Sequence, residues 1–64
     1  MDLREKIIRR GVKALKEFGY PAVTKDNIMT DEIYRAFFKA SIEDAKDVPA
    51  VAAILAEIEQ LEVK

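Results

Sequence analysis

Apolar residues along the chain recur at spacings of three and four, the spacing that places side chains on one face of an α-helix. Three such stretches predict helices over about residues 2–18, 30–46 and 49–62. The pattern therefore predicts an all-α fold, a small three-helix bundle, in a single domain that covers residues 1–64.

The second predicted helix carries apolar residues over a wider arc than one neighbouring helix can cover. At about 100° per residue, these residues form two stripes. The first stripe contains Ile33, Ala36, Phe37 and Ala40, and the second stripe contains Tyr34, Phe38, Ser41, Ile42 and Ala45. A helix of this kind normally lies in the middle of a fold, with one neighbour on each flank.

Two arrangements of the second helix remain open. It can be wedged between its neighbours, which buries both stripes, or it can dock through the first stripe and leave the second stripe partly exposed. We favour the second arrangement, because 64 residues provide little chain to enclose a helix on both sides. Phe37 is then a central core residue. An exposed apolar patch usually marks an interface, and the candidate interface residues are Tyr34, Phe38, Ile42 and Ala45.

The first predicted helix has a start signal, a stop signal and a glycine on its apolar face. Asp2 followed by Glu5 has the shape of a capping box, and Gly19, followed two residues later by proline, is typical of a helix C-cap. Gly11 lies in the centre of the apolar face, where glycine costs about 1 kcal/mol relative to alanine. We expect the close approach of another backbone or ring to compensate, and a tolerated defect is the alternative.

Residues 20–29 connect the first two helices and are too apolar for a loop that is fully exposed to water. We therefore expect four of them to lie over the end of the core, namely Tyr20, Val23, Ile28 and Met29. Thr24 can cap a single turn inside the connection, and we expect Thr30 to cap the second helix.

Pro49 predicts a break between the second and third helices. Proline disfavours a helical conformation at Val48 and lacks the amide hydrogen that a continuing helix needs. Asp47 can then cap the third helix, with Pro49 in its first turn. A single kinked helix is the competing interpretation. The third helix presents one apolar face, formed by Val48, Val51, Ile54, Leu55, Ile58 and Leu61.

The residue inventory favours a non-catalytic protein. The chain has no cysteine, no histidine and one serine, Ser41, so it cannot place a nucleophile beside a base of the familiar kind. We interpret Ser41 as a small residue at a helix contact, with its hydroxyl bonded to the preceding turn. We expect no enzymatic activity, no cofactor and no specific metal. Two oxygen-rich clusters lack the calcium-loop pattern, namely Asp26, Asn27, Asp31 and Glu32, and Glu43, Asp44 and Asp47.

Charge is distributed unevenly, although the net charge is only -1. Five basic residues of the first predicted helix are candidate phosphate contacts, namely Lys6, Arg9, Arg10, Lys13 and Lys16. Such a stripe is typical of a nucleic-acid-binding surface. No aromatic residue lies among these side chains to stack a base, and no Gly-rich phosphate loop is present. We therefore favour a solvated helix face, and an accessory nucleic-acid-binding protein is the alternative.

The segments 19–24 and 27–31, together with Tyr34, Phe37 and Phe38, resemble small uncharacterised proteins of phages and bacterial prophage regions. The resemblance implies a bacterial cytoplasmic setting and no particular activity. The regular patterning is also typical of a designed mini-protein, so the origin stays open.

The surplus apolar surface of the second helix and the lack of catalytic residues predict a non-catalytic protein-interaction module. Such a module would bind another protein or a second copy of itself. No apolar run approaches the length of a membrane span, and residues 1–5 do not open a signal peptide. We therefore expect a cytoplasmic protein with no membrane partner.

Overall fold

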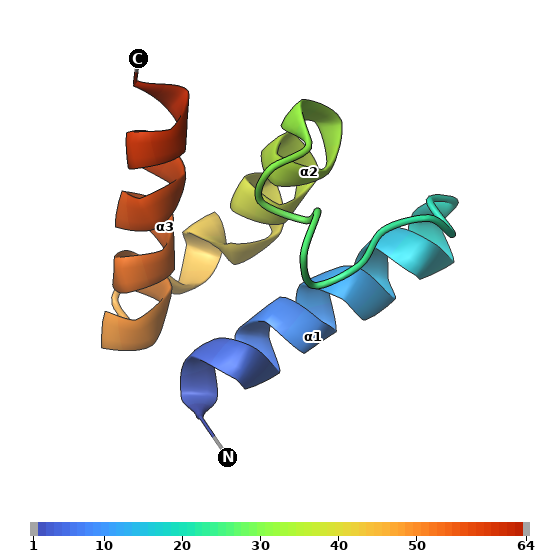
Figure 1. Cartoon of the computed structure of the whole chain (residues 1–64). Helices are drawn as coiled ribbons and strands as arrows, with labels where there is room; N and C mark the ends of the chain where they lie inside the picture. The colour runs from blue at the N-terminus through green and yellow to red at the C-terminus, as the bar shows by residue number, and fades with distance from the viewer. Residues whose placement is uncertain (1, 64) are drawn as a thin grey trace.

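The computed structural model describes residues 2–63, which form three helices (Figure 1). These are α1 (Leu3–Phe18), α2 (Glu32–Ile42) and α3 (Pro49–Glu62), with a short 3-10 turn, η1 (Glu43–Ala45), directly after α2. Each helix contacts the other two, and residues 2–63 contain no strand. The predicted all-α three-helix bundle is confirmed. Met1 and Lys64, which the predicted domain includes, lie outside the described residues.

Helix α1 begins and ends where the sequence predicts. The Asp2 carboxylate accepts a hydrogen bond from the Arg4 amide at 3.1 Å, which makes Asp2 the N-cap. Glu5 is not seen to complete the capping box, because its carboxylate pairs with Arg9 at 2.9 Å instead. At the other end Gly19 has a φ of 123°, a conformation that strains any residue with a side chain.

The connection between α1 and α2 is held by a small polar turn and covers the core. The Thr24 hydroxyl accepts hydrogen bonds from the amides of Asp26 (3.3 Å) and Asn27 (3.2 Å). The Asn27 side chain accepts in return from the Thr24 amide at 2.7 Å. Val23 and Ile28, on either side of this turn, are fully buried. The predicted cap and the predicted apolar cover are both confirmed.

The cap of α2 lies one residue later than predicted. The Asp31 carboxylate accepts from the amides of Ile33 (2.9 Å) and Tyr34 (3.2 Å), so Asp31 and not Thr30 is the N-cap. The Thr30 hydroxyl instead donates to the Asp26 carbonyl at 3.3 Å. A carboxylate carries a full negative charge, which the positive end of the helix dipole favours over a hydroxyl.

A break separates α2 from α3, as predicted, but α2 is shorter than the predicted 30–46. The α-helix ends at Ile42, and η1 and a turn lead to Pro49. Val48 has an extended backbone (φ −79°, ψ 123°), which is the conformation that a following proline favours. Val48 therefore occupies the N-cap position, without a side-chain hydrogen bond, and the prediction that Asp47 caps α3 is wrong. Pro49 lessens the need for a cap because it has no amide hydrogen.

The core uses the second stripe of α2, and the prediction that Phe37 is a central core residue is wrong. Phe38 is fully buried, whereas Phe37 is 37% exposed and Ile33 is 58% exposed. Within residues 2–63 the buried apolar residues of the core are Ile8, Leu15, Val23, Ile28, Phe38, Ile42, Val51, Ile54 and Ile58. Helix α2 is thus rotated about its axis relative to the predicted orientation.

Gly11 explains how the Phe38 ring reaches the centre of the bundle. A Cβ atom at Gly11 would lie 2.5 Å from Cδ1 and 2.6 Å from Cε1 of Phe38, and 3.0 Å from Cδ1 of Ile28. Real side chains do not approach so closely, so the missing Cβ makes the space that the ring occupies. The prediction that a ring closely approaches Gly11 is confirmed.

Arg4 and Glu57 join α1 to α3 through a two-pronged ion pair. The Arg4 guanidinium donates from Nε to Oε2 of Glu57 at 3.0 Å and from Nη2 to Oε1 at 2.7 Å. This hydrogen bonding lowers the pKa of the Glu57 carboxyl and raises the pKa of Arg4. The folded chain therefore favours the charged carboxylate. The stabilisation is full above the ordinary glutamate pKa and is lost as the pH falls through the lowered value.

Glu57→Gln should lower the free energy of unfolding by less than about 1 kcal/mol at neutral pH, because both side chains are close to half exposed. Urea melts of the parent and the variant at a series of pH values check this. The difference should shrink towards zero in acid, where the parent also loses the charge. Glu59→Gln is the matched control, because Glu59 makes no ion pair within residues 2–63. A difference that grows in acid would contradict the assigned pairing.

Candidate functional site

The first stripe of α2 is the exposed apolar surface of this helix. Ile33, Ala36, Phe37 and Ala40 are all exposed, and Phe18, at the end of α1, is 69% exposed beside them. The Phe18 and Phe37 ring centroids are 5.2 Å apart, so the two exposed rings touch across the two helices. We call Phe18, Ile33 and Phe37 the exposed apolar patch.

Two tyrosines hold the exposed rings in place. The Tyr20 ring lies 5.3 Å from Phe37 and 6.1 Å from Phe18, and Tyr34 meets the edge of Tyr20 at 5.7 Å. Both tyrosines are partly buried and pack against the core. Aromatic pairs at these separations attract one another. The exposed apolar patch is therefore built on a supported cluster of four rings.

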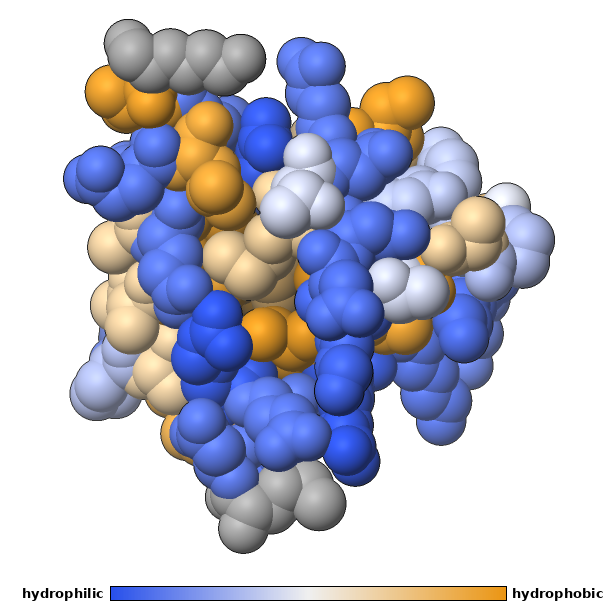
Figure 2. All heavy atoms as spheres, viewed as in Figure 1, coloured by the Kyte–Doolittle hydropathy of each residue, from blue (hydrophilic) through white to orange (hydrophobic). Residues whose placement is uncertain are grey.

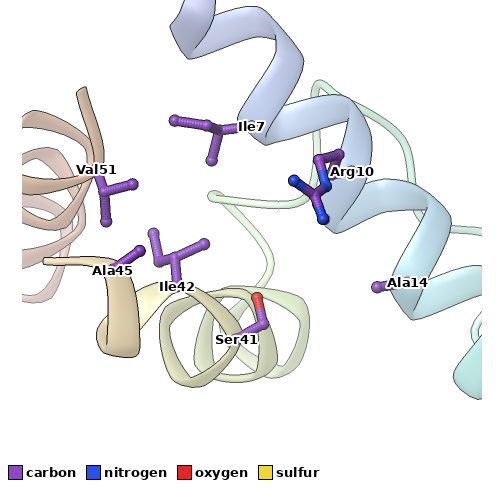
Figure 3. Close-up of a pocket in the computed structure, with 8 residues that line it drawn as sticks. Ile7, Arg10, Ala14, Ser41, Ile42, Ala45 and Val51 are labelled. Carbon is purple, nitrogen blue, oxygen red and sulfur yellow. The ribbon is translucent and has the colours of Figure 1, made fainter. Parts of the chain in front are cut away.

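A shallow groove runs from the exposed apolar patch along the boundary between α1 and α2. Its two hollows, of about 320 Å³ and about 100 Å³, share Gly11, Ala14 and Ser41 in their linings, so they lie next to each other. In Figure 3 the larger hollow is bounded by Ile7 and Arg10 of α1 on one side. Its opposite side is formed by Ser41, Ile42, Ala45 and Val51. The smaller hollow ends at Phe18 and Phe37.

The floor of the groove is low because its residues are small. Gly11 has no side chain, and the side chains of Ala14 and Ser41 are small. The Ser41 hydroxyl donates to the Phe38 carbonyl at 2.7 Å, so this polar group is bonded to the preceding turn as predicted. The floor is mainly apolar, and Arg10 is the one charged side chain that lines these two hollows.

The predicted interface residues do not form an exposed patch. Phe38 and Ile42 are buried in the core, and Tyr34 and Ala45 are partly buried against it, so the prediction that this stripe is left exposed is wrong. Ile42 and Ala45 both form part of the groove wall. The exposed apolar patch was missed because Phe37 was assigned to the core.

The five predicted phosphate-contacting residues all lie on exposed parts of α1. Arg9 is engaged in the ion pair with Glu5, and Arg10 lines the groove. Lys6, Lys13 and Lys16 complete the set and make no ion pair within residues 2–63. The basic face is therefore interrupted by a carboxylate at its start, and part of it belongs to the groove.

The outer side of α3 is also apolar but offers less contact area. Ala52, Ala53 and Ala56 are exposed there, and in Figure 2 pale apolar side chains lie among hydrophilic ones on the left, where Figure 1 places α3. A methyl group buries far less area than a ring, and contact energy follows the area removed from water. The exposed apolar patch is therefore the stronger candidate for a binding site.

The first acidic cluster serves the start of α2. Asp31 caps α2, and Asn27 is bonded within the Thr24 turn. Among residues 2–63, no three or more acidic side chains gather as metal ligands. Within the same range, no helix is long and apolar enough to cross a membrane.

Comparison with protein-family models, curated proteins and solved structures gives no match to this chain. The resemblance to small phage and prophage proteins stays a prediction. The function therefore has to be argued from the surface of the chain itself.

Proposed function

We propose that the chain is a non-catalytic protein-interaction module that acts in the cytoplasm through the exposed apolar patch. The observation that supports the proposal is the exposure of Ile33 and Phe37 on one face of α2, with the exposed ring of Phe18 from α1 against Phe37. Single exposed apolar residues are common on proteins, whereas a group of large ones usually marks an interaction surface.

The side chains of the patch are also held in position before any partner binds, as those of a binding site often are. Its rings lie on helices and are held by Tyr20, so little side-chain freedom would be lost when a partner covers them. Aromatic anchors of this kind carry much of the binding energy in many interfaces. The groove beside the patch provides a recess for side chains of the partner.

The alternative, an accessory nucleic-acid-binding protein, has less support. A phosphate-binding face gains affinity from basic side chains that are free to replace counterions. Arg9 is instead paired with Glu5, and Glu17 lies on the same helix as the basic residues. The four clustered rings lie at the end of α1 rather than among those basic residues.

A photocrosslinking experiment tests the proposed function. A benzophenone amino acid in place of Phe37 should give a protein adduct on irradiation in bacterial lysate, because the ring at this position would lie within the interface. The same amino acid in place of Glu59, which is exposed on α3, is the matched control and should give no adduct. Gel electrophoresis and mass spectrometry read the products. Equal yields at both positions, or no adduct at position 37, would contradict the proposal.

A further inference from the structure

We infer that the partner of the exposed apolar patch is a second copy of this chain, bound as a two-fold dimer in which α1 of each copy faces α2 of the other. The inference rests on the proposed function of the patch. It is carried by the charges on the two walls of the groove, which are opposite in sign.

The α1 wall of the groove is basic. Arg10 lines the groove, and Lys6 and Lys13 lie next to it at spacings of four and three on the same side of the helix. All three are exposed. Glu17 is the one carboxylate on this edge, and it lies towards Phe18 at the other end of the groove.

The α2 wall is acidic at the same end. Ala45 and Ile42 line the groove there, and η1 places Glu43 and Asp44 beside them. Asp47 follows in the turn, and Lys46 is the only basic residue in the segment from Ile42 to Val48. These exposed carboxylates therefore flank the α2 side of the groove, and Arg10 lines its α1 side.

These charges are not used within the described part of the chain. The ion pairs among residues 2–63 are Arg4–Glu57, Glu5–Arg9 and Lys39–Glu62. None of them involves Arg10 or Asp44. Both walls can therefore pair with charges brought by a partner.

A two-fold axis that runs along the groove brings opposite charges together at both walls. Rotation about this axis places the basic wall of each copy over the acidic wall of the other, and it places the patch of one copy on the patch of the other. Such an interface is self-complementary, as a two-fold dimer requires. A foreign helix that carries charge of one sign would be attracted by one wall and repelled by the other.

Charge reversal tests this arrangement directly. Arg10→Glu and Asp44→Arg should each weaken dimerisation by about tenfold or more, because each change turns two attractive pairs into two repulsive ones. An equimolar mixture of the two variants should recover a heterodimer. In one pair the carboxylate introduced by Arg10→Glu faces the guanidinium introduced by Asp44→Arg, and in the other pair the native charges meet. Sedimentation equilibrium and native mass spectrometry measure the species, with the monomer at 7.3 kDa.

Matched controls separate specific pairing from the change in net charge. Lys16→Glu and Glu59→Arg make the same charge changes away from the groove and should leave dimerisation unchanged, and the helical circular dichroism signal should persist in all four variants. The inference would be overturned if the parent chain stays monomeric to about 1 mM. It would also be overturned if neither Arg10→Glu nor Asp44→Arg changes the dissociation constant of the dimer. If the chain is monomeric but position 37 crosslinks to a different protein, the second copy is excluded while the proposed function stands.

Discussion

Replacing Phe38 with alanine should leave the chain largely unfolded at room temperature. The side chain is fully buried at the meeting point of the three helices and the connection. Truncation of a buried phenylalanine costs about 3–5 kcal/mol, because transfer energy is lost and a cavity remains. A domain of this length has roughly 3–10 kcal/mol of total stability. Urea unfolding followed by circular dichroism measures the loss.

Phe37→Ala is the matched control, because it removes the same atoms from the next residue. Phe37 is 37% exposed and lies in the patch, so the variant should fold and melt cooperatively, with a loss of about 1 kcal/mol or less. The pair of variants also separates stability from binding, since only Phe37→Ala should retain the fold while weakening association. If Phe37→Ala unfolds the chain and Phe38→Ala does not, the first stripe is the core stripe after all.

Helix ends were predictable because each depends on a few neighbouring residues. The Asp2 cap, the positive φ of Gly19 and the break before Pro49 follow from local backbone chemistry. The errors at these ends are small and are also local. Asp31 competes with Thr30 for one cap, and Val48 takes the place predicted for Asp47 because its backbone must be extended before proline.

The rotation of α2 was not predictable from periodicity, because its two stripes are similar in apolar content. A stripe pattern shows which residues share a face but not which face meets a neighbour. The deciding contacts are distant in sequence, since the recess at Gly11 and the buried Ile28 receive the Phe38 ring. One signal did exist. The first stripe continues into Asp44 and Asp47, whereas the second continues through Ile42 into Ala45 and Val48.

One stripe of α2 is exposed, as predicted, but the exposed stripe is the first and not the second. Helices α1 and α3 and the connection do not cover both stripes, and one stripe of α2 is left exposed. The exposed stripe is the one that contains Ile33 and Phe37. The observed exposed surface is therefore offset from the predicted one by one residue, which corresponds to a rotation of α2 by about 100°.

Gly11→Ala should destabilise the chain, although the same change in an ordinary helix stabilises it. Alanine gains about 1 kcal/mol over glycine from helix propensity. Here the added Cβ would lie 2.5 Å from the Phe38 ring, and that fully buried ring has no room to move. Overpacking of this kind costs about 1–3 kcal/mol, so the net change should be a loss. Ala14→Gly, at an exposed position of the same helix, should also lose about 1 kcal/mol and calibrates the propensity.

A double-mutant cycle with Phe38→Leu identifies the source of that loss. A leucine at position 38 lacks the ring atoms that the new Cβ would meet, so the combined variant should be less destabilised than the sum of the two single changes. The coupling should exceed about 0.5 kcal/mol, the level at which contacting residues depart from additivity. Chemical denaturation of the four proteins in one buffer gives the cycle. Strict additivity would show that the Phe38 ring does not occupy the space at Gly11, and the reason for a glycine in the middle of α1 would have to lie elsewhere.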